Sequence, residues 1–228
     1  MNTPNIWLVI PAYNEATAIG AVLAEIEKTN YQMVVVDDCS KDETSLVAGK
    51  HRAHIAKHLI NLGQGAALQT GISYALKQGA DYIVSFDADG QHRLEDVERM
   101  LQRLIETKSE VALGSRFLEG GGADNIAPMR YLLLKAATFF TRVTTGLKIT
   151  DTHNGLRVFS RQGAEKIQIT QNRMAHASEI LSIIAEQKLP YVEVPVRIRY
   201  TEYSLRKGQR MSNSFNILWE SFTGILRR

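Results

Sequence analysis

The stretch Tyr82-Ile-Val-Ser-Phe-Asp-Ala-Asp-Gly-Gln-His92 joins a short apolar run to two carboxylates, Asp87 and Asp89, that stand one residue apart. An apolar run of this length with β-branched residues is typical of a buried strand. The two aspartates would then lie at the carboxyl end of the strand, where ligands bind in open α/β sheets. This pair suits a divalent cation, because magnesium usually sits between one or two carboxylates and substrate phosphates. Taken alone, the triplet is also compatible with a turn that caps the next helix.

Apolar runs and amphipathic segments alternate around this stretch. We expect strands at residues 5–10, 33–36, 54–60, 82–86 and 111–114, and helices at residues 16–28, 65–78 and 93–106 and directly after Ser40. This alternation predicts a mostly parallel, doubly wound α/β sheet. Right-handed crossovers would bring the carboxyl ends of the strands to one edge, together with residues 11–15, 37–40, 87–92 and Arg116.

Two of the expected helices begin next to capping residues. Asn14 is a candidate cap for the helix at residues 16–28, and Ser40 with Glu43 matches a capping box for the next helix. Pro11 lacks a backbone donor and is expected to end the first strand. These residues set the predicted boundaries between strands and helices.

The pattern changes beyond the glycines at 120–122. A largely apolar helix is expected at residues 129–143, a polar loop at 150–155, a strand at 156–159, a helix opening at 173–179 and an alternating strand at 191–200. A last helix is expected after the loop at 200–210, with an apolar stripe of Phe215, Leu218, Trp219, Phe222 and Leu226. The basic residues Arg157 and Arg173 are interpreted as surface cations.

Composition is ordinary for a globular protein, with 44% hydrophobic and 22% charged residues among 228. No apolar run approaches the roughly 18 residues of a transmembrane helix. The sequence starts without the basic region or cleavage site of a secretory signal. The single cysteine, Cys39, cannot form an internal disulfide. We therefore expect a cytoplasmic protein.

Charge is distributed unequally along the chain. Residues 1–120 contain 11 Lys or Arg against 16 Asp or Glu, whereas residues 121–228 contain 16 against 8. A basic half suits an anionic substrate or anionic lipid headgroups, and it is also compatible with a basic surface that binds nothing. Nucleic acid is not an expected partner, because the basic residues are scattered and form no recognised binding motif.

Six short motifs resemble one family of enzymes when they are taken in order. They are Pro11-Ala-Tyr-Asn-Glu15, Val36-Asp-Asp-Cys-Ser-Lys-Asp42, Leu62-Gly-Gln-Gly65, Asp87-Ala-Asp-Gly-Gln91, Gly114-Ser-Arg116 and Tyr203-Ser-Leu-Arg-Lys-Gly208. Over nearly the whole chain they resemble glycosyltransferase family 2, the inverting transferases with a GT-A fold, in the branch similar to dolichyl- and polyprenyl-phosphate sugar transferases. The resemblance implies a single Rossmann-like domain in which residues 1–120 bind a nucleotide sugar. Residues 121–228 would form a basic, acceptor-binding part with a C-terminal amphipathic helix.

The resemblance also implies a donor site for a UDP or GDP sugar. Its residues would be Pro11, Ala12, Tyr13, Glu15, Val36, Asp38, Gly65, Asp87 and Ala88. The chemistry agrees, because Tyr13 offers a face on which a base can stack, and Glu15 and Asp38 can accept hydrogen bonds from a base or ribose. One departure from the family pattern is Cys39, at a position where Gly or Asn is common.

By the same resemblance, Asp89 would bind Mg²⁺ or Mn²⁺, with Gln91 as a further oxygen ligand. Arg116 and Lys207 would approach the phosphates and help to stabilise the departing nucleoside diphosphate. His92 is left out of the ligand set, because magnesium bound to a pyrophosphate favours oxygen. The loop around Lys207 contains Ser-Leu-Arg-Lys where the family pattern has an adjacent Ser-Lys.

The kind of acceptor decides whether the reaction needs a base. A lipid phosphate is already anionic at pH 7 and needs only basic residues to hold it, whereas a hydroxyl acceptor must lose a proton to a carboxylate. Asp151, in the polar loop at 150–155, is the candidate base, or else it caps its own loop. The expected acceptor side contains His153, Asn154, His176 and Glu179, which are also compatible with loop ordering and helix packing.

The leading hypothesis is an inverting, metal-dependent glycosyltransferase that serves cell-envelope polysaccharide synthesis with a polyprenyl-phosphate or lipid-linked glycan acceptor. The alternatives are a transferase for a soluble hydroxyl acceptor with Asp151 as base, a sugar-1-phosphate nucleotidyltransferase, and a non-catalytic nucleotide-sugar-binding partner of another enzyme. The nucleotidyltransferase is disfavoured because no Gly-rich loop follows the first strand. The helix at 129–143 and the final stripe permit peripheral contact with the inner face of the cell membrane, although such a stripe is also typical of a core.

Overall fold

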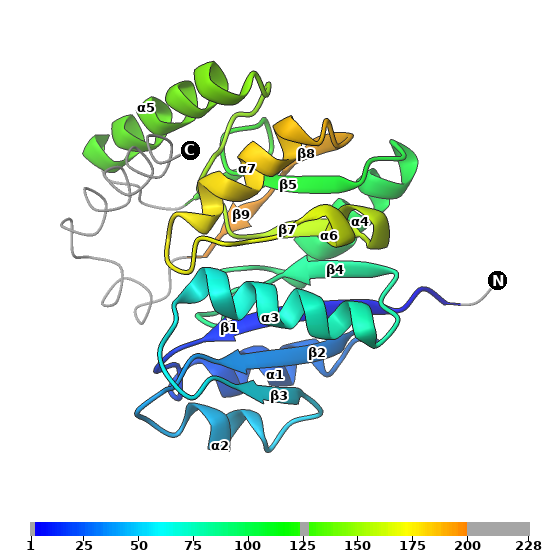
Figure 1. Cartoon of the computed structure of the whole chain (residues 1–228), viewed down its shortest axis with the longest axis vertical. Helices are drawn as coiled ribbons and strands as arrows, with labels where there is room; N and C mark the ends of the chain where they lie inside the picture. The colour runs from blue at the N-terminus through cyan, green and yellow to red at the C-terminus, as the bar shows by residue number, and fades with distance from the viewer. Residues whose placement is uncertain (1–2, 124–127, 200–228) are drawn as a thin grey trace.

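Seven strands form the main sheet in the computed structural model, which describes residues 3–123 and 128–199 (Figure 1). They are β1 (Ile6–Ala12), β2 (Gln32–Asp37), β3 (His54–Lys57), β4 (Tyr82–Ser85), β5 (Val111–Ser115), β7 (Arg157–Ser160) and β8 (Tyr191–Pro195). Their order across the sheet is β3-β2-β1-β4-β7-β5-β8. Strand β7 is antiparallel to both of its neighbours, and the other pairs are parallel. The predicted mostly parallel α/β sheet is confirmed.

Helices cover both faces of this sheet (Figure 1). The helices of the described residues are α1 (Ile19–Ile26), α2 (Thr44–Ala48), α3 (Gln64–Lys77), α4 (Leu94–Glu106), α5 (Pro128–Thr145), α6 (Arg161–Lys166) and α7 (His176–Glu186), of which α5 lies apart from the sheet. Side chains along a strand alternate between its two faces. Leu8 and Ile10 of β1 therefore join the apolar cluster of α1 and α4, whereas Trp7 and Val9 join that of α3, α6 and α7. The strand ends that form the site are thus fixed between two packed layers.

The predictions that Asn14 and Ser40 cap helices are wrong. Helices α1 and α2 begin only at Ile19 and Thr44, and neither has a side-chain cap. Instead, the Asn14 amide donates to Ser40 Oγ at 2.9 Å, and the Asn14 side chain accepts from the Lys41 amide at 2.8 Å. Both polar side chains are used to tie the loop after β1 to the loop after β2.

Two predicted strands are shorter than expected. β3 ends at Lys57 instead of residue 60, because the amides of Leu62 and Gly63 turn back to the Asp38 carboxylate. The expected strand at 191–200 is divided at Pro195, which has no N–H for continued pairing. Beyond it, β9 (Arg197–Ile198) pairs with β6 (Gly122–Ala123) in a separate two-stranded sheet.

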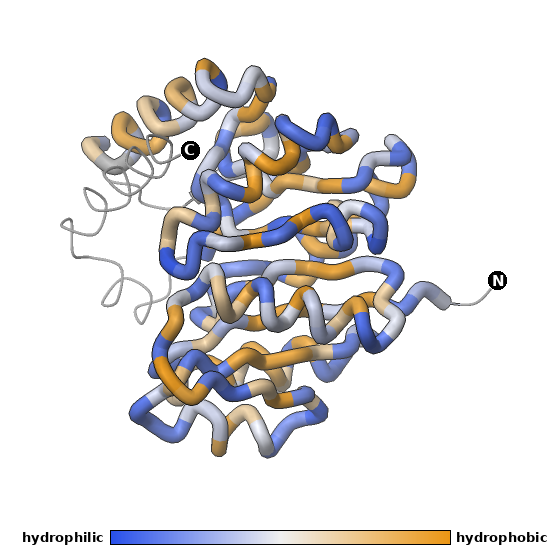
Figure 2. The backbone as a smooth tube through the Cα atoms, in the orientation of Figure 1, coloured by the Kyte–Doolittle hydropathy of each residue, from blue (hydrophilic) through white to orange (hydrophobic). Residues whose placement is uncertain are grey.

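Helix α5 confirms the helix expected at residues 129–143, and it stands at one end of the molecule, away from the sheet (Figure 1). The backbone of α5 carries several strongly hydrophobic residues (Figure 2). Its exposed large apolar side chains are Met129, Tyr131, Leu132, Phe139 and Val143. In the part of the chain that the structure describes, no helix has the length and apolarity needed to cross a membrane. Lys207, the loop at 200–210 and the expected last helix lie outside the described residues.

Candidate active site

The carboxyl ends of β1, β2 and β4 form one side of a cleft, here called the edge cleft. Strand β1 continues through Pro11, which was expected to end it, so Pro11 and Ala12 line the cleft from the strand and Tyr13 and Glu15 from the loop after it. Later loops contribute Asp38, Asp87, Ala88, Asp89 and Gln91. The volume of about 600 Å³ lies within the roughly 300–1,000 Å³ that is usual for small-molecule sites. Residues predicted to bind the donor and the metal are therefore brought together.

Two predicted donor residues lie behind this lining. Val36 is fully buried in the apolar cluster that contains α3. Gly65 lies in the first turn of α3, where a β-carbon would come within 2.0 Å of the Gln171 carbonyl oxygen. These residues set how closely α3 approaches its neighbours, and their side-chain positions do not face the cleft.

Asp87 and His92 form a pair in the edge cleft. His92 Nε2 lies 2.9 Å from Asp87 Oδ2, and Gln64 Nε2 donates to Asp87 Oδ1 at 3.2 Å. Burial would raise the pKa of Asp87, but the hydrogen bond and charge of His92 outweigh burial and lower that pKa. Asp87 is thus an oriented, ionised carboxylate. His92, which was left out of the predicted ligand set, orients this carboxylate and packs edge-on against Phe86.

Asp89 has a less favourable environment for its charge. Burial and the neighbouring charge of Asp87 raise the pKa of Asp89 to about 6. A divalent cation reverses this penalty because it favours the charged form. Among the described residues, no three His, Cys, Asp or Glu side chains are grouped so that they could hold a metal. The side chains of Asp87, Asp89 and Gln91 offer oxygen atoms of the kind that Mg²⁺ or Mn²⁺ prefers, and diphosphate oxygens would have to supply the remaining ligands of such an ion.

The loop after β2 is held by Asp38. Its buried carboxylate accepts from the Leu62 amide at 2.9 Å and the Gly63 amide at 2.6 Å, and it lies 2.7 Å from His58 Nδ1. The next residue, Cys39, has φ +63°. This left-handed conformation explains why Gly or Asn is common at the matching position of the family pattern.

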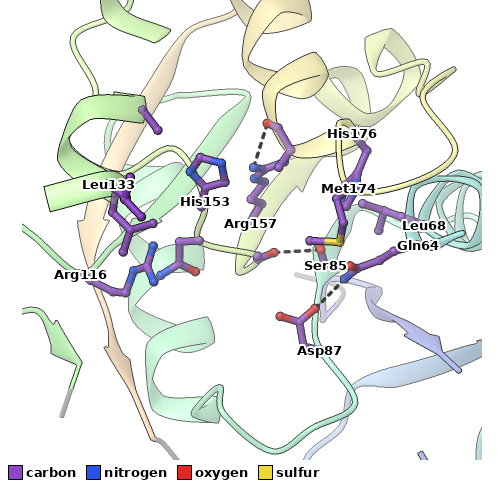
Figure 3. Close-up of a pocket in the computed structure, with 15 residues that line it drawn as sticks. Gln64, Leu68, Ser85, Asp87, Arg116, Leu133, His153, Arg157, Met174 and His176 are labelled. Carbon is purple, nitrogen blue, oxygen red and sulfur yellow. Dashed lines mark hydrogen bonds between the residues drawn. The ribbon is translucent and has the colours of Figure 1, made fainter. Parts of the chain in front are cut away.

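A second cavity adjoins the edge cleft and is here called the arginine cavity (Figure 3). The residues that line both cavities are Gln64, Asp87 and Met174. The predicted site residues that line the arginine cavity are Arg116, His153, Asn154 and His176. Its apolar lining includes Leu133, Leu134 and Ala137 of α5. Two chemically different chambers thus meet just beyond the end of β4.

Arg116 and Asp151 form a buried, bidentate salt bridge. Arg116 Nε donates to Asp151 Oδ2 and Arg116 Nη2 donates to Oδ1, both at 2.7 Å, and the Arg116 amide donates to Oδ2 at 3.1 Å. Burial would raise the pKa of Asp151, but the hydrogen bonds and charge of Arg116 lower it. Asp151 is therefore an engaged anion at neutral pH, which suits a partner for Arg116 better than a proton acceptor.

The expectation that Arg157 is a surface cation is wrong, because this residue is only 3% exposed. Arg157 Nη2 donates to the Ala177 carbonyl at 3.1 Å (Figure 3). It also donates to the Thr152 carbonyl at 3.4 Å. Burial lowers the pKa of Arg157 to about 10, so the group stays charged at neutral pH. The antiparallel direction of β7 brings its first residue opposite Ser85, at the edge where β4 ends. Arg173, in contrast, is exposed as predicted.

Asn154 is buried and His153 is half-buried, and both have buried polar atoms that lack hydrogen bonds among the described residues. Burial lowers the pKa of His153 to about 4, so its ring is neutral, and neither ring nitrogen bonds to any other described residue. Asn154 Oδ1 accepts from the Leu156 amide at 2.9 Å, while Asn154 Nδ2 also lacks a partner in the described ranges. Both residues line the arginine cavity and leave polar atoms there for a ligand.

His176 and Glu179 both lie in the first turn of α7, but only His176 lines the arginine cavity. Burial lowers the pKa of His176, whose Nδ1 lies 2.7 Å from the Arg173 carbonyl. Glu179 accepts hydrogen bonds from the amides of Thr170 and Gln171. Glu179 therefore holds the segment that leads into α7.

The fold is that of the GT-A glycosyltransferases. A crystal structure of glucosyl-3-phosphoglycerate synthase from Mycobacterium tuberculosis, in complex with Mn²⁺, UDP and phosphoglyceric acid, matches it with a TM-score of 0.71. The match has 15% identity and covers 94% of this chain and 76% of that chain. More particularly, this chain belongs to glycosyl transferase family 2, whose sequence model matches residues 7–168. The resemblance seen in the motifs is confirmed.

Two curated relatives are similar over much of their length. UDP-N-acetylglucosamine–dolichyl-phosphate N-acetylglucosaminyltransferase of Methanococcus voltae is 32% identical over 94% of this chain and 93% of its own length. Polyprenol monophosphomannose synthase of Mycolicibacterium smegmatis is 31% identical over 74% of this chain and 66% of its own length. The chain is thus a glycosyltransferase with relatives named for lipid-phosphate chemistry.

Proposed function

We propose that this glycosyltransferase moves a sugar from a nucleotide diphosphate to the phosphate of a polyprenyl-type lipid, with inversion at the anomeric carbon. The observation that carries the proposal is that the edge cleft and the arginine cavity meet at Asp87. The acidic cleft suits a nucleotide diphosphate bound with a cation, and the arginine cavity suits a phosphate attached to a hydrocarbon chain. The names of the two relatives support a lipid-phosphate acceptor.

The donor would occupy the edge cleft. Tyr13 is 38% exposed, so its ring is accessible to a base, and Glu15 lines the cleft beside it. A divalent cation at Asp89 and Gln91 would supply positive charge against the leaving diphosphate. His92 keeps Asp87 ionised and oriented for that arrangement. The Mn²⁺ and UDP named in the complex of the mycobacterial enzyme support a metal-assisted donor site.

The acceptor would react from the arginine cavity. A phosphate oxygen attacks the anomeric carbon, the bond from that carbon to the diphosphate breaks, and the nucleoside diphosphate leaves from the opposite face. The acceptor phosphate is already an anion, so no proton has to be removed. This chemistry agrees with the engagement of both Asp151 oxygens by Arg116. A hydroxyl acceptor would instead require Asp151 to leave that salt bridge and take a proton.

We place this reaction in cell-envelope polysaccharide synthesis, at the inner face of the cell membrane. The support is α5, which lines the arginine cavity with Leu133 and Leu134 and exposes other apolar side chains. Arg142, also on α5, is exposed and suits anionic headgroups. A lipid acceptor would then extend from the cavity along this helix.

The test is a panel of UDP and GDP sugars with Mg²⁺ or Mn²⁺, offered with undecaprenyl phosphate in detergent. The expected result is a metal-dependent glycosyl phospholipid with inverted anomeric configuration. Free undecaprenol and simple glycosides, which present hydroxyl acceptors, should not be glycosylated. Transfer to a hydroxyl and not to the lipid phosphate would contradict the proposal.

A further inference from the structure

Arg157 is a buried cation that lines the arginine cavity and has no role in the reaction proposed so far. We propose that Arg157 and the side-chain amide of Asn154 form the site that binds the anionic phosphate of the acceptor, and so select phosphorylated over neutral acceptors. The inference rests on the proposed function and assigns a residue to its acceptor specificity. Three observations carry it.

The first observation is that Arg157 is a buried charge without a salt bridge in the described part of the chain. Arg157 is buried, yet among the described residues it takes part in no salt bridge. Within the same residues, its two hydrogen bonds both come from Nη2 and go to backbone carbonyls. A guanidinium has five N–H donors, so the N–H groups on Nε and Nη1 of Arg157 remain available to a ligand. A buried charge is costly unless it is paired, and an anionic ligand supplies the pairing.

The second observation is that the other arginine of the cavity is already neutralised. Arg116 directs both Nε and Nη2 to Asp151, which is itself buried. An incoming phosphate would have to compete with this bidentate carboxylate. Arg157 presents its donors without such competition, and guanidinium groups bind phosphate oxygens well.

The third observation is the neighbourhood of Arg157. Asn154 is 5% exposed, lines the same cavity and leaves Nδ2 without a hydrogen-bond partner in the described part of the chain. Figure 3 shows Arg157 between His153 and Met174, with Asp87 across the cavity. The carboxylates whose charges act on Arg157 are Asp151 and Asp87, and these are engaged by Arg116 and His92. A phosphate on Arg157 therefore lies next to the meeting point of the two cavities.

The experiment measures the binding of geranyl phosphate, a short lipid phosphate, by isothermal titration calorimetry. Geraniol, the corresponding uncharged alcohol, is the control ligand. The native protein should bind geranyl phosphate in preference to geraniol. Arg157→Gln should weaken the binding of geranyl phosphate about 10- to 100-fold, which is the loss of affinity expected when hydrogen bonds to a charged group are removed. Binding of UDP with Mn²⁺ should stay within about twofold. Arg161→Gln is the matched control, because it removes the same charge from α6 at the other end of β7.

Kinetics separate a binding role from a purely structural one. In Arg157→Gln the KM for geranyl phosphate should rise while kcat at saturation changes little, and Arg157→Lys should recover part of the loss. If Arg157→Gln does not fold, Asn154→Asp replaces it, since the carboxylate still accepts from the Leu156 amide but repels a phosphate. Asn154→Asp should then weaken geranyl phosphate at least about 10-fold.

The outcomes distinguish this inference from the proposed function. Unchanged geranyl phosphate affinity in folded Arg157→Gln, or a larger loss of UDP binding than of geranyl phosphate binding, overturns the role of Arg157. If the native protein binds geranyl phosphate through Arg157 but transfers no sugar to any lipid phosphate, the proposed function fails and the anion site stands.

Discussion

The edge cleft and the arginine cavity share Asp87 but are built in different ways. In the cleft, loops that follow parallel strands hold each other, as Asp38 does for the segment before α3. In the arginine cavity, a buried salt bridge and buried polar atoms that have no partner within residues 3–123 and 128–199 face an apolar helix. The cleft is organised by backbone topology and the cavity by buried charge. Changes in the cleft should therefore affect turnover, and changes in the cavity should affect stability as well.

The largest effect is expected from Asp89→Asn in the edge cleft. A neutral amide cannot hold a cation against the diphosphate, so kcat should fall at least about 100-fold. The free energy of unfolding should not decrease, because burial already raises the pKa of Asp89 to about 6. Turnover with Mn²⁺ and urea unfolding measure the two quantities. Exposed Glu95→Gln on α4 is the control, and turnover close to native in Asp89→Asn would remove Asp89 from the site.

The second effect tests the arginine cavity. Asp151→Asn should lower the free energy of unfolding by about 3 kcal/mol, because it leaves Arg116 buried without its counter-charge. The double variant Arg116→Gln with Asp151→Asn should lower the free energy of unfolding by less than the sum of the decreases in the two single variants. Glu106→Gln, in the exposed pair with Arg103, should have no measurable effect in the same urea titration. Equal losses in both pairs would show that buried charge does not organise the cavity.

The third effect is confined to acid conditions. His153 has a folded pKa of about 4 against an ordinary value of 6.5, so the unfolded chain binds more protons between these values. Stability should therefore fall as pH decreases from 6.5 to about 4, and His153→Gln should show a shallower fall. Urea unfolding at several pH values measures the slopes. An unchanged slope in His153→Gln would place that ring in contact with water.

The smallest effect on stability is expected on α5. Phe139→Ser changes a side chain that is 70% exposed, so the free energy of unfolding should stay within about 0.5 kcal/mol. Sedimentation with phosphatidylglycerol vesicles should nevertheless fall severalfold, because apolar side chains at the interface contribute to binding. Leu46→Ser on α2, 60% exposed and at the far end of the molecule, is the control (Figure 1). Absence of native binding to these vesicles would contradict contact through α5.

Much of the edge cleft could be predicted from the sequence, because residues that line it follow directly after buried strands, although Val36 and Gly65 lie behind the lining. Asp87 and Asp89 after β4 and Asp38 after β2 needed only the rule that parallel strands end at one edge. The capping predictions failed for a related reason. Asn14 and Ser40 are good caps in isolation, but a hydrogen bond between two loops distant in sequence replaced that use.

The arginine cavity was not accessible in the same way. The sequence offered His153, Asn154 and Arg116 as site residues, but not the salt bridge that commits Arg116 to Asp151. Arg157 was missed because its place depends on the direction of β7, and a strand of four residues does not indicate whether it runs parallel or antiparallel. The burial of Arg157 results from tertiary packing, and no local sequence pattern indicates it.

Gln64, Asp87 and Met174 line both cavities and form a wall between them. This shared wall bears on the order in which the two substrates of the proposed reaction bind. Since each chamber has its own lining beyond that wall, the two substrates can be held simultaneously. Catalysis should then proceed through a ternary complex, with intersecting double-reciprocal plots, and without the parallel lines of a ping-pong enzyme that stores the sugar covalently.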